Sequence, residues 1–175
     1  MTDNFPTRKN IRLKDFDYSS KGAYFITICT ENRKNYFWKK DFELQNYTVK
    51  VVGANCVRPQ NLPLSVYGEI VFNELSVWNN AYESVRMNAF VIMPNHIHLL
   101  VEILGDELGR TQFAPTISRM VKQFKGAVTK RIGKTIWQKS FMEHIIRDQT
   151  DYDIKLNYIY ENPIRWKDDE LYFEF

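Results

Sequence analysis

The pattern of apolar positions predicts four strands and three helices. Strands are expected where aromatic and β-branched residues run together, and these segments are 22–30, 87–93, 95–103 and a shorter one within 136–146. Helices are expected where apolar residues recur every three or four positions, and these start at Leu64, at Pro115 and at Asp148 or Thr150. Gly133 is a suitable end for the second helix, and Pro163 stops the third near Asn162.

The order of these elements predicts the fold class. It is strand, helix, strand, strand, helix, strand and a last helix, which without the last helix is the split β-α-β order of ferredoxin-like proteins. We therefore expect an α+β fold, with a ferredoxin-like antiparallel sheet, helices packed on it and one further C-terminal helix. The 175 residues suit a single domain that spans positions 1–175. Residues 49–64, rich in Gly, Asn and Pro, predict an irregular loop outside this core.

His96 and His98 form the first candidate site, on the strand that follows a turn at Pro94 and Asn95. Side chains alternate between the two faces of a strand, so both imidazoles project from one face while Ile97 lies on the other. Two neighbouring imidazoles on a stiff strand are a good geometry for one divalent metal ion. A purely structural role for the pair is the alternative, and a third ligand is needed to favour the metal.

The last predicted helix offers both a third ligand and a nucleophile. Tyr158 and Asn162 are four residues apart, so they lie on one helix face, one turn from each other. If Asn162 presents its amide oxygen to a metal ion on the histidines, Tyr158 brings its hydroxyl beside the same ion. Two imidazoles and an oxygen ligand suit Mg²⁺ or Mn²⁺ when phosphate oxygens are further ligands. Such a set would support attack of Tyr158 on a DNA phosphate, although the chain has ten tyrosines and packing is the alternative role.

Positive charge is concentrated in one segment, although the net charge of +3 says little by itself. Residues 108–142 contain no Asp or Glu but eight of the 24 Lys and Arg residues. A long basic segment of this kind is typical of proteins that bind the phosphate backbone of nucleic acids, and a solvated helix face is the alternative. The candidate DNA-binding residues are Arg119, Lys122, Lys125, Lys130, Arg131 and, from the following segment, Arg147.

Composition argues against several other classes of protein. No apolar run approaches the roughly 20 residues that a membrane-spanning helix needs, and residues 1–10 lack the apolar core of a signal peptide. Cys29 and Cys56 have neither metal-like nor scaffold-like spacing. The expectation is therefore a soluble protein of the reducing cytoplasm, associated with nucleoid DNA and without a membrane partner.

Several short motifs resemble those of one family of DNA-cleaving enzymes. The segment Val91-Ile92-Met93-Pro94-Asn95-His96-Ile97-His98 is similar to the histidine–hydrophobe–histidine (HUH) motif of single-tyrosine transposases. The chain further resembles the REP-associated tyrosine transposase branch of that family in Arg12-Leu13-Lys14, residues 23–30, Trp137-Gln138 with Phe141, residues 144–148, and Tyr158-Ile159 with Asn162-Pro163 and Trp166. This resemblance extends over almost the whole chain and is weakest in residues 49–64.

The resemblance implies a ferredoxin-like core and a metal-dependent enzyme that cuts and rejoins single-stranded DNA at hairpin-forming, REP-like sequences. It assigns His96 and His98 as metal ligands, Tyr158 as the nucleophile and Asn162 as the third ligand, with Mg²⁺ or Mn²⁺ as cofactor. It implies single-stranded or hairpin DNA as the partner, and either a monomer or a homodimer. The role of His144 stays open between a contact to the DNA or its leaving oxygen and a structural one.

Two alternative functions are open on the sequence alone. One is a protein that binds DNA hairpins and has lost the catalysis of such a transposase, which the intact set of metal ligands and tyrosine disfavours. The other is a small-molecule metalloenzyme that uses the histidine pair, which the acid-free basic segment disfavours. A covalent adduct between the protein and DNA would distinguish the transposase from both.

Overall fold

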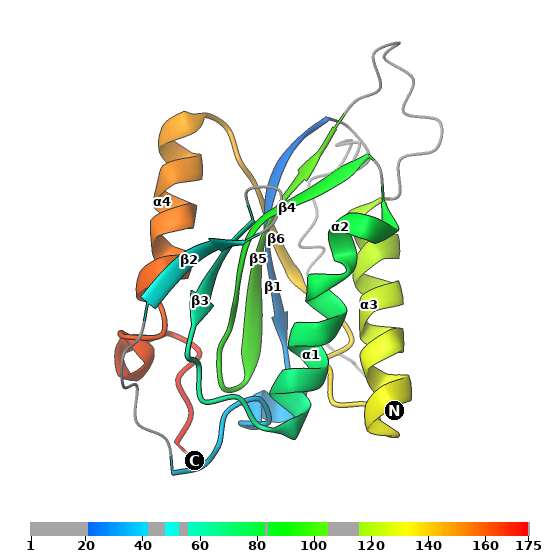
Figure 1. Cartoon of the computed structure of the whole chain (residues 1–175), viewed down its shortest axis with the longest axis vertical. Coiled ribbons are helices and arrows are strands. Elements are labelled where there is room, and N and C mark those ends of the chain that lie inside the picture. The colour runs from blue at the N-terminus through cyan, green and yellow to red at the C-terminus, as the bar shows by residue number, and fades with distance from the viewer. Residues whose placement is uncertain (1–20, 42–47, 53–55, 83, 105–115, 175) are drawn as a thin grey trace, which may run out of the picture.

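The computed structural model of the protein describes residues 21–41, 48–52, 56–82, 84–104 and 116–174. Within them, six strands form one sheet in the order β2-β3-β4-β5-β1-β6 (Figure 1). The strands are β1 (Gly22–Cys29), β2 (Thr48–Val52), β3 (Cys56–Gln60), β4 (Val85–Ile92), β5 (His96–Ile103) and β6 (Met142–Ile145). The helices are α1 (Val66–Ser76), α2 (Trp78–Ala81), α3 (Ile117–Ile132) and α4 (Gln149–Glu161), with short 3-10 helices η1 (Glu31–Arg33) and η2 (Trp166–Asp168).

The strands β4, β5, β1 and β6 form the ferredoxin-like part of the sheet. Each neighbouring pair among them is antiparallel. The chain runs β1-α1-β4-β5-α3-β6 through this part, apart from the hairpin and short helices that are inserted between these elements. This is the split β-α-β order, and α4 follows it as the last long helix. The predicted α+β fold is therefore confirmed.

The segment 49–64, predicted as an irregular loop, instead contributes two strands to the sheet. β2 pairs with β3 in antiparallel register, and β3 joins β4 in parallel at Val57 and Ala89. The prediction was wrong because it took the glycine, asparagine and proline residues of this segment as signs of a loop. A proline keeps an extended backbone, and Pro59 lies opposite Val49 of β2 in the sheet.

The three long helices begin at capping side chains, of which the sequence analysis named only Asp148. Ser65, Thr116 and Asp148 each accept a hydrogen bond from the N–H three residues further on, at 3.1, 3.3 and 2.9 Å. Gly133 follows α3 in the left-handed conformation, with a φ of 82° that favours glycine. Within the described ranges, none of the helices has the length and hydropathy of a bilayer-spanning segment.

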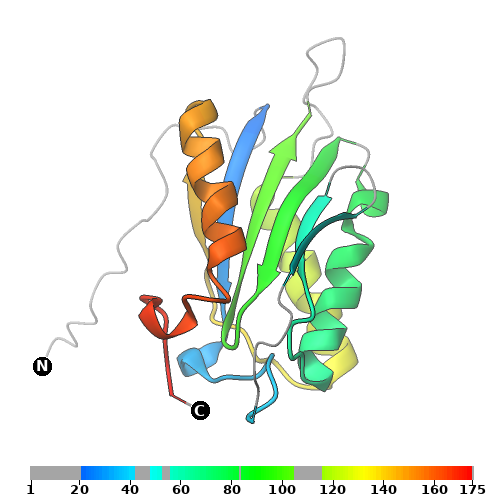
Figure 2. The ribbon, with the colours of Figure 1, turned by 60° about the vertical axis from the view of Figure 1, so that its left-hand side comes forward.

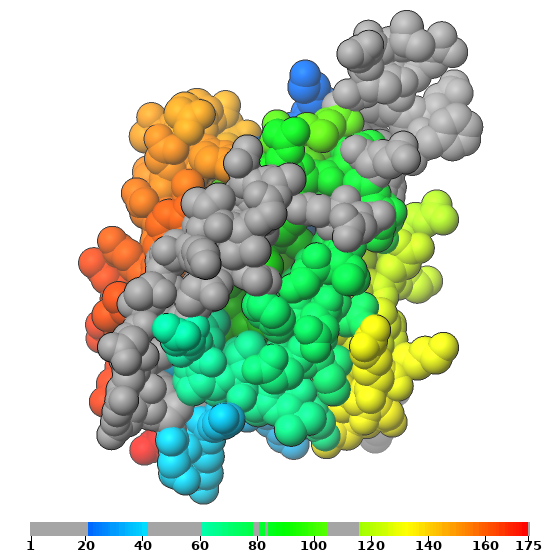
Figure 3. Space-filling view, in the orientation of Figure 1, coloured from blue at the N-terminus to red at the C-terminus, as the bar shows by residue number. Residues whose placement is uncertain are grey.

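Different helices cover the two faces of the sheet (Figure 2). α1 and α3 pack side by side on the face where Ile97, Leu99 and Val101 are buried. α4 crosses the opposite face, toward which His96 and His98 project. The space-filling view shows α4 and α3 at opposite sides of the molecule (Figure 3). The histidine pair therefore lies beneath α4 rather than on an open sheet surface.

Gly68 allows the first turn of α1 to approach the preceding segment closely. A Cβ atom at this position would lie 2.2 Å from the carbonyl oxygen of Phe37. Gly126 of α3 has no atom within 4 Å of the corresponding position. Alanine substitutions at the two glycines should therefore have opposite effects on stability.

We expect Gly68→Ala to lower the free energy of unfolding by about 3 kcal/mol, because the backbones at positions 37 and 68 must separate. Gly126→Ala is the matched control, and we expect it to raise the free energy of unfolding by about 0.5–1 kcal/mol, since alanine favours a helix. Urea unfolding followed by circular dichroism measures both values. Equal effects of the two substitutions would contradict the close approach.

Candidate active site

His96 and His98 lie at the start of β5, with their Nε2 atoms 3.0 Å apart. β5 pairs with β4 on one side and β1 on the other, so the backbone that carries them is held on both edges. The two residues are only 0% and 3% exposed. Burial lowers the pKa of His96 to about 3, and burial together with the neighbouring His96 lowers the pKa of His98 well below its usual range. Both imidazoles are therefore neutral at physiological pH, which is the form that binds metal ions.

The side-chain amide of Asn95 orients the His96 ring. Asn95 Nδ2 donates hydrogen bonds to the carbonyl oxygens of Arg33 and Leu171, at 3.2 and 2.8 Å. Its Oδ1 consequently faces His96 Nδ1, at 2.8 Å. Because an amide oxygen only accepts hydrogen bonds, we assign the proton of His96 to Nδ1 and the lone pair to Nε2. His96 thus directs toward His98 a nitrogen lone pair that could bind a metal ion.

Thr27 of β1 orients His98. The two residues are direct partners in the β1–β5 register, and Thr27 Oγ1 lies 2.8 Å from His98 Nδ1. A hydroxyl can donate or accept, so Thr27 supports either tautomer of His98. In one tautomer, the Nε2 atoms of the two histidines share a hydrogen bond. In the other, both Nε2 lone pairs are free for a common ligand without any rotation of the rings.

α4 brings Tyr158 and Asn162 over the histidine pair. The ring centroids of Tyr158 and His98 are 5.1 Å apart. The Tyr158 hydroxyl donates to Asp169 Oδ2 at 3.1 Å, and Asn162 Nδ2 donates to the same oxygen at 2.8 Å. Asn162 Oδ1 is buried and has no hydrogen-bond partner among the described residues. The structure therefore brings the predicted tyrosine, amide and imidazoles together, with one buried oxygen whose partner is missing.

Asp169 is a residue of the site that the sequence analysis missed. Its carboxylate and the ring nitrogens of His96 and His98 offer ligand atoms that all lie within 4.8 Å of one another. The segment that carries Asp169 follows η2 and returns to the site where Trp166 packs against His96, with 6.1 Å between ring centroids. Helical periodicity could not reveal Asp169, because Pro163 separates it from the helix of Tyr158. The three side chains form a cluster that could hold a divalent metal ion.

The surroundings of Tyr158 are buried on one side and acidic on the other. Burial raises the pKa of Tyr158 to about 12, and the Asp169 carboxylate adds to this effect. A cleft of about 380 Å³ beside the hydroxyl is lined by Tyr158, Glu161, Asn162, Arg165, Asp168, Asp169 and Glu170. Its only guanidinium, Arg165, pairs with Glu161 at 3.1 Å. The cleft therefore attracts cations and repels a phosphate whose charge is not neutralised.

The basic helix lies away from this site. Five of the predicted DNA-binding residues are on α3, across the sheet from α4, and these are Arg119, Lys122, Lys125, Lys130 and Arg131. Arg147 lies next to Asp148, the N-cap residue of α4, and is exposed. The histidine–tyrosine cluster and the helical cations thus occupy opposite faces of the molecule.

Two of the α3 cations are engaged within the fold. Lys125 Nζ donates to the carbonyl oxygens of Gln138 and Ser140, at 2.8 Å each. Burial lowers the pKa of Lys125 to about 8. The Arg131 guanidinium forms an ion pair with Glu74 of α1. The other three cations on this helix are exposed.

His144 of β6 is tied to the first turn of α4. Its Nε2 atom lies 2.9 and 2.8 Å from the two carboxylate oxygens of Asp151. Asp151 also accepts a hydrogen bond from the backbone N–H of Arg147, at 3.1 Å. These contacts hold the edge strand to the helix, which favours the structural role for His144.

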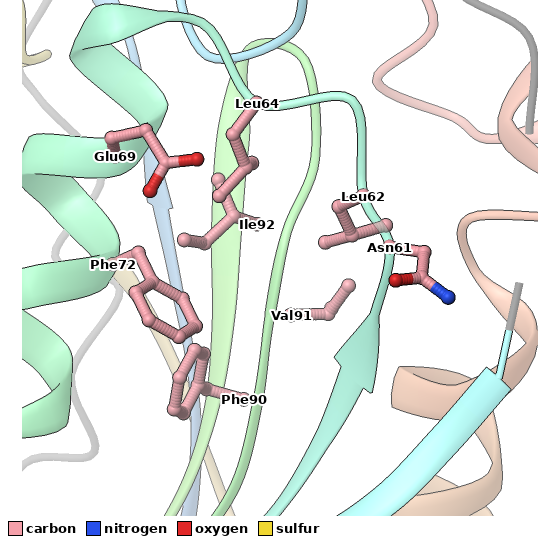
Figure 4. A pocket seen from close by; sticks show the side chains of 8 residues that line it. All are labelled: Asn61, Leu62, Leu64, Glu69, Phe72, Phe90, Val91 and Ile92. Atoms are coloured by element: carbon pink, nitrogen blue, oxygen red, sulfur yellow. The ribbon is translucent and has the colours of Figure 1, made fainter.

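A second pocket, of about 250 Å³, opens between α1 and the end of β4 (Figure 4). Its lining consists of Asn61, Leu62, Leu64, Glu69, Phe72, Phe90, Val91 and Ile92. The rings of Phe72 and Phe90 pack with their centroids 6.1 Å apart. Glu69 is the single titratable side chain of this lining, which contains no histidine or tyrosine. None of the candidate catalytic residues therefore lies in this pocket.

We expect Lys125→Ala to lower the free energy of unfolding by about 1–3 kcal/mol, because the carbonyl oxygens of Gln138 and Ser140 lose their donor. Lys122→Ala removes an exposed lysine from the same helix and should change stability by no more than about 0.5 kcal/mol. Chemical denaturation of the two variants measures the difference. A loss for Lys125→Ala no larger than that for Lys122→Ala would mean that the two carbonyl contacts contribute nothing.

The ferredoxin-like sheet, the paired histidines of β5 and the tyrosine of the facing helix define a protein of the single-tyrosine HUH class. No protein-family model matches the chain. An uncharacterized protein of Haemophilus influenzae is 33% identical over 189 residues, covering 95% of this chain and 94% of that protein. The REP-associated tyrosine transposase of Escherichia coli is 35% identical over 149 residues, covering 85% of this chain and 70% of that protein.

A solved structure of a REP-associated tyrosine transposase bound to a REP hairpin shares the fold. It matches with a TM-score of 0.58 at 22% identity, over 88% of this chain and 74% of that chain. The chain belongs to the REP-associated tyrosine transposase family. The resemblance predicted from the motifs is therefore confirmed, and the function is of the transposase type. Of the motifs that carried the resemblance, Arg12-Leu13-Lys14 lies outside the described residues.

Proposed function

We propose that the protein cuts and rejoins single-stranded DNA at hairpin-forming, REP-like sequences through a covalent bond between Tyr158 and a 5′-phosphate. The observation that carries the proposal is the position of Tyr158 at the histidine cluster. Its hydroxyl donates to Asp169, whose carboxylate lies with the two imidazoles in one group of potential ligands. Membership of the transposase family supports DNA as the substrate, and the REP hairpin bound by a solved relative supports the hairpin form.

Mg²⁺ or Mn²⁺ is the cofactor that fits the donor set. His96 and His98 offer neutral nitrogens, Asp169 a carboxylate, and Asn162 a buried Oδ1 that lacks a partner among the described residues. Nitrogen and hard oxygen donors of this kind suit such ions when phosphate oxygens complete the coordination. When bound, the ion supplies Lewis-acid polarisation of the scissile phosphate. We propose the two histidines and Asn162 as ligands, with Asp169 as a further one.

Tyr158 is the proposed nucleophile. Its oxygen forms a bond to phosphorus while the bond from phosphorus to O3′ breaks, and the O3′ atom takes a proton from solvent and leaves as a 3′-hydroxyl. The phenolic proton passes to the Asp169 carboxylate, which accepts the hydrogen bond of the hydroxyl. In the rejoining step, a 3′-hydroxyl attacks the phosphotyrosine and releases Tyr158. The phenolate takes back the proton held by Asp169, and the attacking 3′-hydroxyl gives its proton to solvent. Cleavage exchanges a phosphodiester for a phosphotyrosine ester and rejoining reverses the exchange, so no external energy source is needed.

The cations of α3 and Arg147 are proposed contacts to the DNA backbone. Arg119, Lys122 and Lys130 are exposed on α3, and exposed cations in an acid-free segment attract phosphates. The two engaged cations of this helix, Lys125 and Arg131, would have to exchange an internal partner for a phosphate. We therefore propose a larger share of the binding for the three exposed side chains.

We expect Tyr158→Phe to abolish the covalent adduct with a labelled hairpin oligonucleotide, because the variant has no attacking oxygen. Hairpin affinity should be nearly unchanged, since a single hydroxyl is removed. Tyr160→Phe is the matched control on the same helix and should form the adduct. A denaturing gel reports the adduct, and fluorescence anisotropy reports the affinity.

Two results would count against this proposal in different ways. An adduct formed by Tyr158→Phe would show that another residue is the nucleophile. A wild-type protein that binds the hairpin in Mn²⁺ and forms no adduct would favour the alternative of a catalytically idle hairpin-binding protein.

We expect Thr27→Val to weaken Mn²⁺ binding by about 10- to 100-fold, because His98 loses the hydroxyl that supports its ligating tautomer. Thr27→Ser keeps the hydroxyl and should retain the wild-type affinity. Isothermal titration calorimetry with Mn²⁺ on the DNA-free protein compares the three proteins. Equal affinities would show that Thr27 does not orient a metal ligand.

A further inference from the structure

We propose that Lys155 binds a non-bridging oxygen of the DNA phosphate that Tyr158 attacks. This inference rests on the proposed function and adds a substrate-binding residue that belongs to neither the histidine motif nor the tyrosine–asparagine pair. The ligand group is the phosphate anion of a single-stranded segment. The ring of Phe25 on β1 lies beneath the helix and contacts Lys155, His98 and Tyr158.

Phe25 connects Lys155 with the candidate active site. Lys155 precedes Tyr158 by three positions on α4, so the two side chains lie on one side of the helix. Lys155 Nζ lies 5.2 Å from the centroid of the Phe25 ring. The same ring stacks on His98 at 5.0 Å and meets the edge of the Tyr158 ring at 5.9 Å. The ammonium group is therefore held near the nucleophile and the imidazoles by contact with one shared ring.

The nearest carboxylate along the helix forms no ion pair with Lys155. Asp151, one turn earlier, accepts hydrogen bonds from His144 and from the backbone N–H of Arg147. Among the described residues, no carboxylate lies within 4.0 Å of Lys155 Nζ. Lys155 is also half-buried, so solvent ions screen its charge less than that of an exposed lysine. A half-buried ammonium without a close anion is well suited to bind a phosphate.

The distribution of charge around Tyr158 gives the direction from which a phosphate approaches. On the C-terminal side of Tyr158, the cleft is lined by four carboxylates and one arginine that is already paired. On the N-terminal side lies Lys155, above Phe25. A phosphate is repelled on the first side and attracted on the second. The scissile phosphate therefore reaches Tyr158 from the side of Lys155, and this cation offsets part of its charge.

A purely structural role for Lys155 makes a different prediction. A cation over an aromatic ring is worth about 0.5–1 kcal/mol at an exposed site, so Lys155 could simply pack on Phe25. In that case its removal would affect stability or the position of α4 but would not depend on the charge of one phosphate. An experiment that varies the phosphate charge therefore separates the two roles.

The experiment measures equilibrium DNA affinity for each combination of a Lys155 variant and a modified oligonucleotide. All proteins carry Tyr158→Phe, so that the DNA stays intact. The probes are fluorescent hairpin oligonucleotides with single-stranded flanks, each carrying one uncharged methylphosphonate at a different flank position, together with the unmodified oligonucleotide. The variants are Lys155→Ala and Lys155→Arg, and Lys40→Ala serves as the control for an exposed lysine outside the site. Thermal denaturation shows that each variant is folded.

We expect Lys155→Ala to weaken binding of the unmodified hairpin by about tenfold, as for a hydrogen bond to a charged group, and to lower its salt dependence by about 0.7 in the logarithmic slope. With the methylphosphonate at one flank position, the loss should fall below about twofold, because Lys155 has no charge to bind there. Lys155→Arg should retain most of the affinity. The change in affinity caused by Lys40→Ala should be the same with and without the methylphosphonate at that position.

A loss of equal size at every methylphosphonate position, or no loss on the unmodified hairpin, would overturn the proposal. Wild-type adduct formation is a separate measurement, and it also maps the scissile phosphate. If the wild-type protein forms an adduct, the methylphosphonate position that reduces the effect of Lys155→Ala must be the scissile phosphate mapped by the adduct. A reduced effect at another position instead overturns the assignment of Lys155 to the scissile phosphate. If no adduct forms, the proposed function fails, while the affinity measurements still show whether Lys155 contacts a phosphate.

Discussion

The pairing of β5 with both of its neighbours is the constraint on which the rest of the site depends. It places His96 and His98 in the interior of the sheet, where an imidazolium would have to be desolvated. The histidines therefore remain neutral, and each needs a hydrogen-bond partner at Nδ1. Asn95 and Thr27 supply these partners from the turn before β5 and from β1. The sheet thus determines the charge and the orientation of both rings.

α4 and the segment after it complete the site from the other side of that face. Tyr158 and Asn162 come from the helix, and Asp169 comes from the returning chain beyond Pro163. Their polar groups meet at one carboxylate oxygen, which accepts from both the phenol and the amide. The result is an acidic cleft beside a buried pair of neutral nitrogens. Such an environment favours a divalent cation and requires positive charge, from an ion or from a lysine, before a phosphate can enter.

Much of the fold could be predicted from the sequence because its signals are local. Alternation placed His96 and His98 on one strand face, helical spacing placed Tyr158 beside Asn162, and Asp148 was one of two candidate caps for the last helix. The hairpin within residues 48–60 could not be predicted this way, because its pairing with β4 depends on tertiary contact. The roles of two residues outside the motifs could not be predicted either. Asp169 enters the site because the chain reverses after the last helix. Lys155 is distinguished from other helical lysines only by its tertiary contact with Phe25.

The most direct test of the central claim is a crystal structure of the protein soaked in Mn²⁺, with anomalous scattering recorded near the manganese edge. We expect one anomalous peak bonded to Nε2 of both His96 and His98, with an oxygen of Asn162 or Asp169 as a further ligand. The Nε2 atoms should then no longer share a hydrogen bond. A peak that avoids the histidines, or a hydrogen-bonded pair that persists with Mn²⁺ bound elsewhere, would contradict the claim that these imidazoles hold the metal ion.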